Sequence, residues 1–376
     1  MSIKILHTAD NHIGMKFSNH SPLARTRLIQ ERINALQEIV NTANNEKVNY
    51  LVVAGDLFDS TIVKLADIKA TAAILNGFLG DAVIIIPGNH DFYESAPETL
   101  WSKFSKYSNE GKVFLLNEYK LFEHEIGEQK VNFYPAACRS KHSDQNMIGW
   151  VKNVEKDTQA LNIGIAHGNV TGLGLDEGDK YFNMTADELK HSALDFWLLG
   201  HIHVPFPTTG TIGQNPGFFM SGTHTPDGWN RNQAGSCWLI EVGDDKSIKA
   251  ELLNPSKIRF YDLEETINSE ADLNRLKNKI QNLDAASSLL RLTVNGRISE
   301  DLLTQLNTLL QDSEDGYVEF LYTNLVKLNI DAAYINSNYT TGSLPHTLLT
   351  ELAQDDGEGI SLQLANDLIE KLKISQ

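Results

Sequence analysis

Five short apolar segments of the sequence each end on aspartate, asparagine or histidine. In VIIIPGNHD, for example, four branched apolar residues and a Pro-Gly pair precede Asn89, His90 and Asp91. The polar residues after the five segments are Asp10 and His12, then Asp56 and Asp59, then Asn89, His90 and Asp91, then His167, and finally His201 and His203. Carboxylate, imidazole and amide oxygen without a thiolate suit Mn²⁺, Fe²⁺ or Zn²⁺ better than copper or an iron–sulfur cluster. The residue types therefore indicate a metal site.

The number of these side chains indicates two ions rather than one. A carboxylate can bridge two cations, and two ions roughly 3.5–4 Å apart form a clamp for in-line displacement at phosphorus. Asp10 and His12 are two residues apart, so both side chains can point to one side of an extended segment, and His201 and His203 have the same spacing. The chemistry that this pattern favours is phosphoester hydrolysis.

Each ending also has a structural alternative. A single histidine at a strand end is usually a polar cap, and a single Gly-Asp pair is usually a turn. Glycine directly precedes Asp56, Asn89 and His201, which permits sharp backbone turns at the ends of the strands. Because all five endings occur in one chain, we favour the metal site over five unrelated caps and turns.

The elements that must position these side chains alternate between strand and helix patterns in the first half of the chain. The expected strands are Ile3–His7, Tyr50–Val53, Ala82–Ile86, Asn162–Ala166 and Asp195–Leu199. Thr26–Ala43 and Leu65–Leu79 carry apolar residues at helical spacing. This order predicts a mostly parallel sheet with helices on its faces. The functional crevice of such a sheet lies beyond the carboxyl ends of its strands, where the polar side chains stand.

Later strand patterns indicate antiparallel pairing. Tyr119–Glu125 and Val131–Tyr134 flank Gly127, and Ser236–Val242 and Ile248–Leu253 flank the Gly-Asp pair at 243–244. We therefore predict a first domain of the α/β (α+β) class over residues 1–255, in which a two-layer sheet is covered by helices.

After residue 255 the sequence becomes charged and rich in leucine. The expected elements are a helix at Ala271–Leu283, a strand at Leu289–Val294, a helix at Asp301–Leu310 and a strand at Val318–Tyr322. Pro345–Ala353 and Ser361–Ile374 then show apolar residues at helical spacing. These patterns predict a smaller α/β domain over 256–340 and a C-terminal helical segment over 341–376.

Composition and charge restrict the class of protein. The length of 376 residues accommodates one large and one smaller domain. The net charge is −17, and the last 76 residues hold three Lys and Arg against twelve Asp and Glu, which argues against strong non-specific binding to duplex nucleic acid. The apolar runs are shorter than the roughly 20 residues of a membrane helix, and we expect no signal peptide. Two cysteines, Cys138 and Cys237, argue against a disulfide framework and favour a cytoplasmic protein.

The five motifs resemble those of the calcineurin-like metallophosphoesterases, which run D-x-H, G-D, G-N-H-D, H and G-H-x-H. The resemblance implies a two-layer β-sandwich flanked by helices, with a dinuclear centre. It assigns Asp10, His12, Asp56 and His203 to one ion, and Asp56, Asn89, His167 and His201 to the other, so that Asp56 bridges them. It further implies that His90 stays unligated and protonates the leaving oxygen or stabilises the phosphate charge, while Asp91 orients His90.

Within this superfamily, the segments HTADNHIGMKF, VVAGDLFDS and IIPGNHDFYE resemble the SbcD-type exonucleases of DNA double-strand-break repair. The resemblance is specific for about residues 1–245, and beyond them only the order of elements is similar to that family's capping domain. It implies DNA as a partner and an SbcC-type coiled-coil ATPase that docks on the C-terminal helices. The alternative for these helices is a pair that only covers its own domain.

Five residues are further candidates for substrate contact: His20, Arg25, Arg27, Asp59 and His224. Arginines near a helix start could meet phosphates, but each candidate has an alternative as a surface residue or, for Asp59, as a helix N-cap.

We expect a hydrolase with two divalent ions, Mn²⁺ first and Fe²⁺ or Zn²⁺ as alternatives. The expected reaction is in-line attack of a metal-bound hydroxide on DNA, with His90 as the acid. The alternatives are a phosphatase or phosphodiesterase of nucleotides or other small phosphate esters, and a non-catalytic scaffold. The acidic surface favours the small esters, whereas AGDLFD and the second domain favour the nuclease. Strand polarity, endonuclease or exonuclease action, and homodimerisation stay open.

Overall fold

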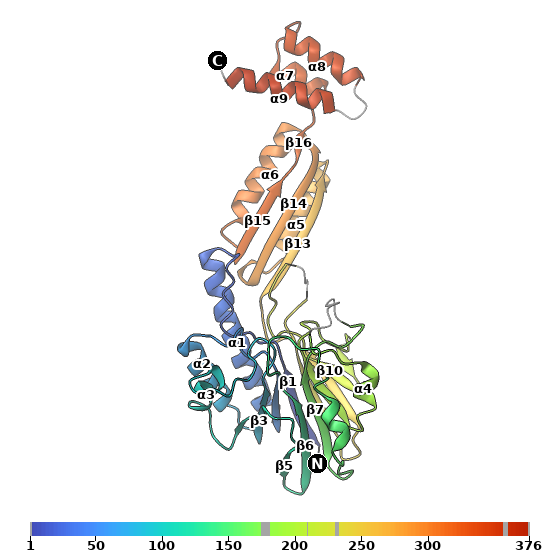
Figure 1. Ribbon diagram of the computed structural model, residues 1–376. Coiled ribbons are helices and arrows are strands. Elements are labelled where there is room, and N and C mark those ends of the chain that lie inside the picture. The colour runs from blue at the N-terminus through green and yellow to red at the C-terminus, as the bar shows by residue number, and fades with distance from the viewer. Residues whose placement is uncertain (1, 174–180, 209, 230–232, 356–359, 375–376) are drawn as a thin grey trace. The chain divides into compact units, whose positions relative to one another are not determined.

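A computed structural model describes residues 2–173, 181–208, 210–229, 233–355 and 360–374 (Figure 1). The chain divides into two compact units, Met1–Phe260 and Tyr261–Gln376. This boundary follows residue 260, whereas the sequence pattern suggested one after residue 255. Among the described residues, no helix is both long enough and apolar enough to cross a membrane.

The first sheet of unit 1 is mixed. Its strand order is β4-β3-β2-β1-β11-β12-β9. The strands are β1 (Ile3–Thr8), β2 (Tyr50–Ala54), β3 (Ala82–Ile86), β4 (Val113–Leu115), β9 (Thr211–Ile212), β11 (Cys237–Val242) and β12 (Ile248–Leu253). Strands β1 to β4 run parallel to one another, and β11 pairs antiparallel with both β1 and β12. Because β1, β2 and β3 are parallel, their carboxyl ends meet at the same edge.

The second sheet has the order β10-β8-β7-β6-β5. Its strands are β5 (Phe122–Ile126), β6 (Gln129–Ala136), β7 (Leu161–His167), β8 (Phe196–Gly200) and β10 (Phe218–Met220). The β5–β6 pair is antiparallel, as the pattern around Gly127 predicted, and the remaining pairs are parallel.

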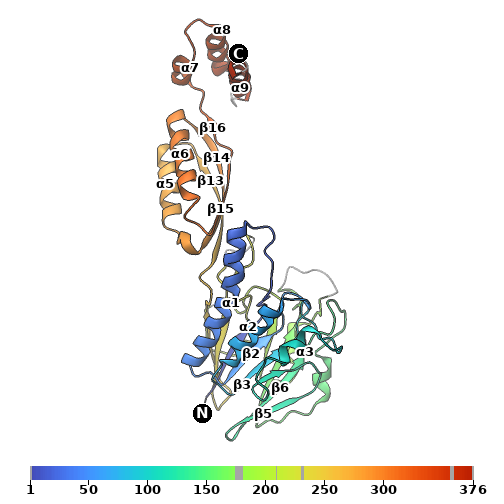
Figure 2. The same ribbon diagram turned by 90° about the vertical axis from the view of Figure 1, so that its left-hand side faces the viewer.

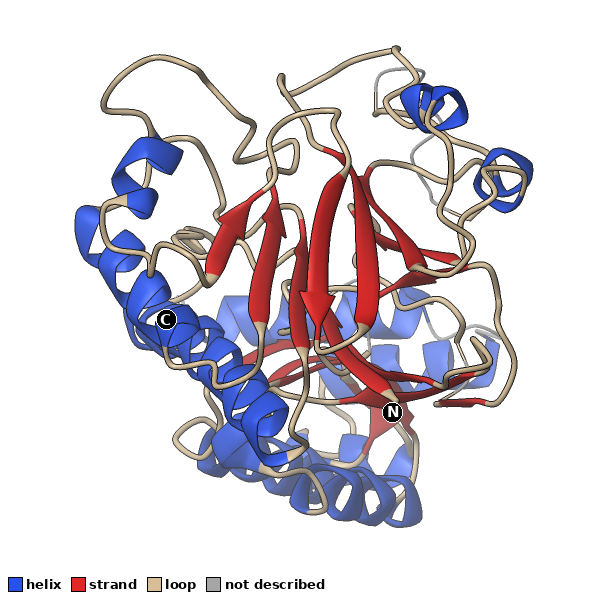
Figure 3. Ribbon diagram, turned by 90° about the horizontal axis from the view of Figure 1, so that it is seen from below, coloured by secondary structure: helices blue, strands red, loops and turns tan. Residues whose placement is uncertain are grey.

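The two sheets form a sandwich with an apolar interior. Ile5, Val52 and Ile84 of the first sheet share one buried cluster with Phe133 and Ile163 of the second. The outer face of the first sheet packs against α1 (Pro22–Asn45), α2 (Leu65–Asn76) and α3 (Leu100–Ser105). The outer face of the second sheet packs against the 3₁₀ helix η1 (Gly149–Asn153) and α4 (Ala186–Lys190). Figure 3 shows the strands of this sandwich with helices outside them. The expected fold class, mixed α/β with sheets flanked by helices, is confirmed.

Helix α1 begins four residues before the predicted start at Thr26. Ser21 is its N-cap and accepts a hydrogen bond from the backbone N–H of Ala24, while Pro22 occupies the first helical turn. A serine cap followed by proline is a strong helix start, because both residues remove unsatisfied N–H groups. The apolar periodicity alone did not include this polar first turn.

Unit 2 contains a smaller sheet with two helices on one face (Figure 2). Its elements are β13 (Arg259–Ile267), α5 (Glu270–Gln281), η2 (Ala285–Ser287), β14 (Ser288–Ile298), α6 (Glu300–Ser313), β15 (Glu319–Asn324) and β16 (Lys327–Leu328). Strand β14 is central and pairs in parallel with β15 and β16. Leu290 and Leu292 of β14 pack with Leu276 of α5 and Leu306 of α6. Strand β13 is an addition to the predicted elements.

The described residues that follow form the helices α7 (Ala332–Asn338), α8 (Leu344–Asp355) and α9 (Ile360–Ile374). Ile335, Tyr339, Leu349 and Leu362 form a small buried cluster among them. Helices α8 and α9 correspond to the two predicted C-terminal helices, and residues 356–359 between them lie outside the described part. Helix α7 was not among the predicted elements and lies within the range assigned to the preceding domain. Its seven residues are too few to give a clear periodic signal in the sequence.

Candidate metal centre

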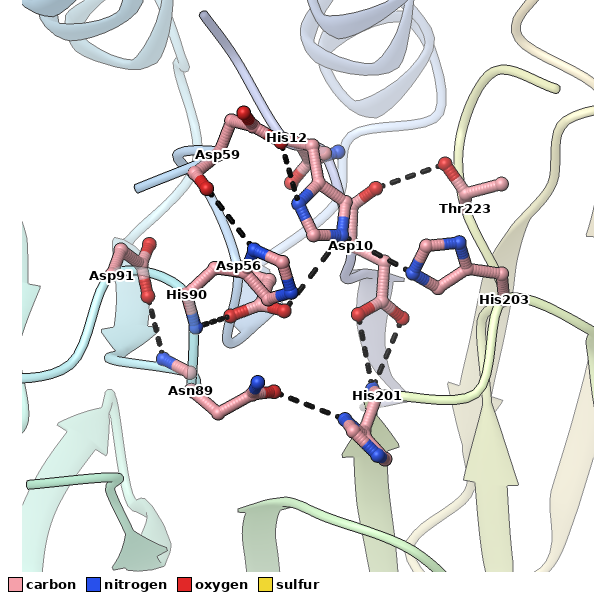
Figure 4. Close-up of polar contacts among 12 residues, drawn as sticks. Asp10, His12, Asp56, Asp59, Asn89, His90, Asp91, His201, His203 and Thr223 are labelled. Carbon is pink, nitrogen blue, oxygen red and sulfur yellow. Dashed lines mark hydrogen bonds and ion pairs between the residues drawn. The ribbon is translucent and has the colours of Figure 1, made fainter. Parts of the chain in front are cut away.

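The carboxyl ends of five strands bring the predicted polar side chains together (Figure 4). Asp10 and His12 follow β1, Asp56 follows β2, Asn89 and His90 follow β3, His167 ends β7, and His201 and His203 follow β8. Among the described residues, three groups have ligand atoms within 4.8 Å of one another: Asp10, His12 and His203; His12, Asp56 and His90; and Asp10, Asp56 and His167. Because these groups share members, they form one continuous cluster of candidate metal ligands.

Two imidazoles converge on one side of the cluster. The Nε2 atom of His12 lies 3.1 Å from Nε2 of His203 and 3.7 Å from Oδ2 of Asp56. His12 is 1% exposed. Burial lowers the pKa of His12, although the carboxylates of Asp59 and Asp56 oppose this effect. A neutral imidazole with a buried ring nitrogen is the form that binds a metal ion.

His167 provides the clearest test of whether a cation fits. Its Nδ1 atom lies 2.9 Å from the carbonyl oxygen of Ala54, and because a carbonyl only accepts, Nδ1 carries a proton. Its Nε2 atom then faces Oδ2 of Asp56 at 3.2 Å and Oδ1 of Asn89 at 3.0 Å. A lone pair that faces two oxygen atoms needs a positive charge between them. The residues therefore fit a divalent cation at this point.

Without a metal ion, a proton would supply that charge. Burial opposes the charged form of His167, but the carboxylates of Asp56 and Asp10 outweigh burial and raise its pKa to about 9. The effect is reciprocal for Asp56. Burial disfavours its charged form, yet His167 and His12 hold the pKa of the Asp56 carboxyl well below its usual range. The ionised carboxylate of Asp56 thus dominates the electrostatics of the centre.

Several candidate ligands have a strained backbone. The φ angles of Asp10, His12, Asp56 and His201 are 53°, 43°, 51° and 96°. Residues other than glycine rarely adopt this left-handed region, and such strain persists only where surrounding contacts enforce it. Here the His12 N–H donates to the carbonyl of Asp56, and the His201 N–H donates to the carboxylate of Asp10 at 3.0 Å. These bonds hold the loops after β1, β2 and β8 in register.

Glycine is required before Asp56, Asn89 and His201 mainly because neighbouring atoms leave no space for a Cβ atom at these three positions. A Cβ atom at Gly55 would lie 2.2 Å from Nδ1 of His167, and one at Gly88 would lie 2.2 Å from Oδ1 of Asp56. A Cβ atom at Gly200 would lie 2.2 Å from the carbonyl oxygen of Ala54. Of these three, Gly55 alone has a positive φ, at 89°. The expectation of sharp turns therefore holds for Gly55, whereas Gly88 and Gly200 leave room for other groups.

His90 and Asp91 do not form the expected pair. The Nδ1 atom of His90 lies 3.0 Å from the carbonyl oxygen of Asp59. The two carboxylate oxygens of Asp91 accept from the backbone N–H groups of Gly88 and Phe58 at 2.7 and 3.0 Å. The prediction that Asp91 orients His90 is therefore wrong. The Asp59 backbone has that position instead, and Asp91 ties the β2 and β3 loops together.

Comparisons with known proteins agree with this geometry. Residues 3–205, which are more than half of the chain, match the family model of the calcineurin-like phosphoesterases. The chain belongs to this family. Members of the family use divalent metals.

A curated relative of this phosphoesterase is the uncharacterized metallophosphoesterase YhaO of Bacillus subtilis (strain 168). It is 28% identical over 213 residues, which are 54% of this chain and 48% of the relative. The phosphoesterase chain thus spans about half the length of that relative. A solved structure, TT1561 of Thermus thermophilus, covers 68% of this chain and 100% of its own, at 11% identity and a TM-score of 0.38.

The five accessory candidates of this phosphoesterase have different positions. Oδ1 of Asp59 lies 3.5 Å from Nδ1 of His12, so Asp59 belongs to the centre. The N-cap alternative for Asp59 is wrong, because Lys64 caps α2. His224 is fully buried, which contradicts both substrate contact and a surface position, and its Nε2 lies 2.9 Å from the carbonyl oxygen of Arg32.

The remaining three candidates lie near the start of α1. Arg25 donates to the carbonyl oxygens of Ser18 and His20, each at 3.2 Å. The ring of His20 lies 6.1 Å from that of Trp229. Arg27 is exposed on α1. Substrate contact by these three residues stays a prediction.

In the described part of the chain, residues outside the five motifs also contact the cluster. Oδ2 of Asp227 lies 2.5 Å from Nδ1 of His203. The Thr223 hydroxyl donates to the carbonyl oxygen of Asp10 at 2.9 Å, and Arg32 Nη1 donates to the carbonyl oxygen of Asn11 at 2.7 Å. Sequence reasoning missed them, because a threonine, an aspartate in a loop and an arginine on a helix give no local signal. The predicted candidate His224 lies in the same segment as Thr223 and Asp227, so it was the signal nearest to them in the sequence.

Proposed function

We propose that this phosphoesterase hydrolyses phosphodiesters with two divalent metal ions that share Asp56. The observation that carries the proposal is the position of one oxygen atom. Oδ2 of Asp56 lies 3.2 Å from Nε2 of His167 and 3.7 Å from Nε2 of His12. His12 and His167 belong to different ligand groups, so one carboxylate faces both groups. This arrangement suits a ligand that bridges two ions.

The assignment of ligands is the one that the family resemblance implies. The first ion would take Asp10, His12, Asp56 and His203, and the second would take Asp56, Asn89, His167 and His201. Bound ions would neutralise charge on the phosphate and lower the pKa of a water molecule. The donor set favours Mn²⁺, with Fe²⁺ or Zn²⁺ as alternatives. The chain itself holds the ligands in place through the backbone bonds of the β1, β2 and β8 loops.

His90 is the residue that we assign to proton transfer. The Asp59 carbonyl accepts from Nδ1 of His90, so Nε2 is the atom that can bind and release a proton. The His90 ring lies edge-on to that of His12, with 4.7 Å between centroids, and is partly exposed. A protonated His90 at this position can stabilise the phosphate charge and then protonate the leaving oxygen.

We further propose DNA as the substrate, as in the SbcD-type exonucleases. The segments AGDLFD and GNHDFYE and the presence of a second α/β unit support this assignment. The net charge of −17 favours the alternative, a small phosphate ester. The test is hydrolysis with Mn²⁺ of a 5′-labelled DNA duplex beside a chromogenic phosphodiester. Shortening of the duplex supports the nuclease, whereas ester cleavage with intact DNA moves the function to a small-molecule phosphodiesterase.

The C-terminal helices offer a surface for the proposed ATPase partner. Leu344, Leu348 and Leu368 line an apolar groove of about 440 Å³ on α8 and α9. Leu344 is 81% exposed and Leu368 52%. We propose that an apolar segment of an SbcC-type coiled-coil ATPase fills this groove, in the manner of a helix in a hydrophobic groove.

Replacement of Leu368 by glutamate tests the docking surface. We expect Leu368→Glu to abolish co-elution with the coiled coil of such an ATPase. Leu79→Glu, which changes a leucine that is 77% exposed in unit 1, should leave co-elution intact. Concentration-dependent dimerisation that Leu368→Glu removes would instead identify the groove as a contact between two copies of this chain.

A further inference from the structure

Asp227 lies directly behind one of the proposed metal ligands. It belongs to the segment between β10 and β11, outside the five motifs. Its Oδ2 atom lies 2.5 Å from Nδ1 of His203, and its side chain is 15% exposed. Because the carboxylate accepts, Nδ1 of His203 carries the proton and Nε2 presents its lone pair. That Nε2 atom lies 3.1 Å from Nε2 of His12, inside the ligand group that also contains Asp10.

We propose that Asp227 is a positioning residue that fixes the tautomer and ring orientation of His203 for the first metal ion. The inference rests on the proposed two-ion function. A carboxylate bonded to the outer ring nitrogen of a ligating histidine orients the ring and raises the basicity of the ligating nitrogen. Loss of such a partner typically weakens metal binding about 10–100-fold.

Neighbours of Asp227 in the same segment contact the loop after β1, directly or through Arg32. The Thr223 hydroxyl donates to the carbonyl oxygen of Asp10 at 2.9 Å. Nε2 of His224 donates to the carbonyl oxygen of Arg32, whose Nη1 donates to the carbonyl oxygen of Asn11. Asn11 stands between Asp10 and His12, both of which have a positive φ. Residues 223–227 therefore support both halves of the first ligand group, the strained loop after β1 and His203.

The charge of Asp227 has a second neighbour. Arg32 is 1% exposed, and its Nε and Nη2 atoms have no hydrogen-bond partner among the described residues. Burial lowers the pKa of Arg32, and the negative charge of Asp227 is the largest contribution that opposes burial. The carboxylate of Asp227 therefore has two partners that suit an acceptor, the Nδ1–H group of His203 and the buried guanidinium.

Calorimetric titration of the metal-free full chain with Mn²⁺ tests the inference. Wild type should bind two ions. In Asp227→Ala we expect the affinity for one ion to fall about 10–100-fold while the other stays unchanged. Asp227→Asn should lose less, because an amide oxygen can still accept from Nδ1. The matched control is Asp195→Asn, which removes a 20% exposed carboxylate paired with Lys246 at 2.9 Å, and it should keep both affinities.

The tautomer of His203 is a second readout that a merely structural role would not move. Long-range ¹H–¹⁵N spectra of the metal-free protein should show the proton on Nδ1 in wild type and a mixture of tautomers in Asp227→Ala. If Asp227→Ala fails to fold, Asp227→Asn decides through the same two measurements.

Three outcomes would overturn the inference. If wild type binds two ions and the Asp227 variants bind both as tightly with the same tautomer, Asp227 has no positioning role, although the proposed function stands. An equal loss of both ions in a folded variant would indicate general destabilisation instead. If wild type binds no Mn²⁺, the proposed function fails and the inference fails with it.

Discussion

The Nε2 atoms of His12 and His203 lie 3.1 Å apart, although 191 residues separate them in the chain. His12 follows β1 of one sheet and His203 follows β8 of the other, so the sandwich itself sets their distance. The ligand groups of this phosphoesterase are thus assembled across the two sheets. Changes that alter the packing of the strand ends should therefore also weaken metal binding.

Replacement of His90 by alanine should separate metal binding from hydrolysis. His90 Nδ1 bonds to a backbone carbonyl, and we assign its Nε2 to proton transfer rather than to a metal ion. We expect His90→Ala to bind two Mn²⁺ ions and to hydrolyse a phosphodiester about 10²–10⁴-fold more slowly. Metal content and initial rates measure the two effects. Full activity, or loss of one ion, would show that this role of His90 is wrong.

Replacement of Gly88 by alanine should displace the bridging carboxylate. The added Cβ atom would lie 2.2 Å from Oδ1 of Asp56, which also accepts the His90 N–H at 2.8 Å. We expect at least about a tenfold loss of Mn²⁺ affinity, comparable to the loss of a direct partner of a ligand. Gly213→Ala is the control, because nothing lies within 4 Å of its Cβ position. Equal Mn²⁺ affinity of the two variants in calorimetry would contradict the predicted crowding.

Replacement of Arg32 by methionine should destabilise the folded protein. Arg32 is buried, bonds to the Asn11 carbonyl at 2.7 Å and lies 5.4 Å from the Phe17 ring. Its removal leaves the nearby carboxylates without their buried cation, so we expect the free energy of unfolding to fall by about 3 kcal/mol.

Arg139→Met is the matched control for Arg32. Arg139 also bonds to a backbone carbonyl, that of Asn117, and lies 5.2 Å from the Tyr119 ring, but it is exposed. We expect a change within about 0.5 kcal/mol. Denaturant unfolding measures both variants, and similar losses for the two would argue against a special role of Arg32.

The buried imidazole of His7 should make the fold sensitive to acid. Burial lowers the pKa of His7 to about 3, partly offset by the Leu199 backbone. Between pH 6.5 and 3 the unfolded chain binds a proton that the folded chain does not, so stability falls as the pH falls through this window. The slope reaches about 1.4 kcal/mol per pH unit for each such histidine.

His7→Phe should therefore lose less stability than wild type between about pH 6.5 and 5. Denaturant unfolding at several pH values measures the difference, and titration of other groups is common to both proteins. His142→Gln, which removes an exposed imidazole, should keep the pH dependence of wild type. A parallel dependence of His7→Phe and wild type would contradict the lowered pKa.

Much of the site could be predicted from sequence because its signals are local. Asp10, Asp56 and His167 each stand at or just after the end of an apolar strand, and strand order then brings them to one edge. Asp227 could not be predicted in the same way. Its contact with His203 depends on the path of the loop between β10 and β11, and a loop aspartate is common without any such role.

Burial and long-range pairing explain the other differences. His224 was a candidate for substrate contact with a surface position as the alternative, but it is fully buried, and no periodic pattern surrounds it in the sequence. Strand β13 carries Asp262, Glu264 and Glu265, which have low strand propensity, so pairing in the sheet overrides the local preference. The Asp91 prediction failed because adjacency in the GNHD motif does not determine which neighbour a side chain contacts.

The most direct test of the two-ion site is hydrolysis of a chromogenic phosphodiester by the metal-free full chain as Mn²⁺ is added back, for wild type and Asp56→Asn. We predict no hydrolysis in the presence of a chelator and a full rate when two ions are bound per chain. Asp56→Asn should lose both hydrolysis and the binding of two ions per chain. A full rate with one ion per chain, or an active Asp56→Asn, would contradict a centre in which Asp56 bridges two metal ions.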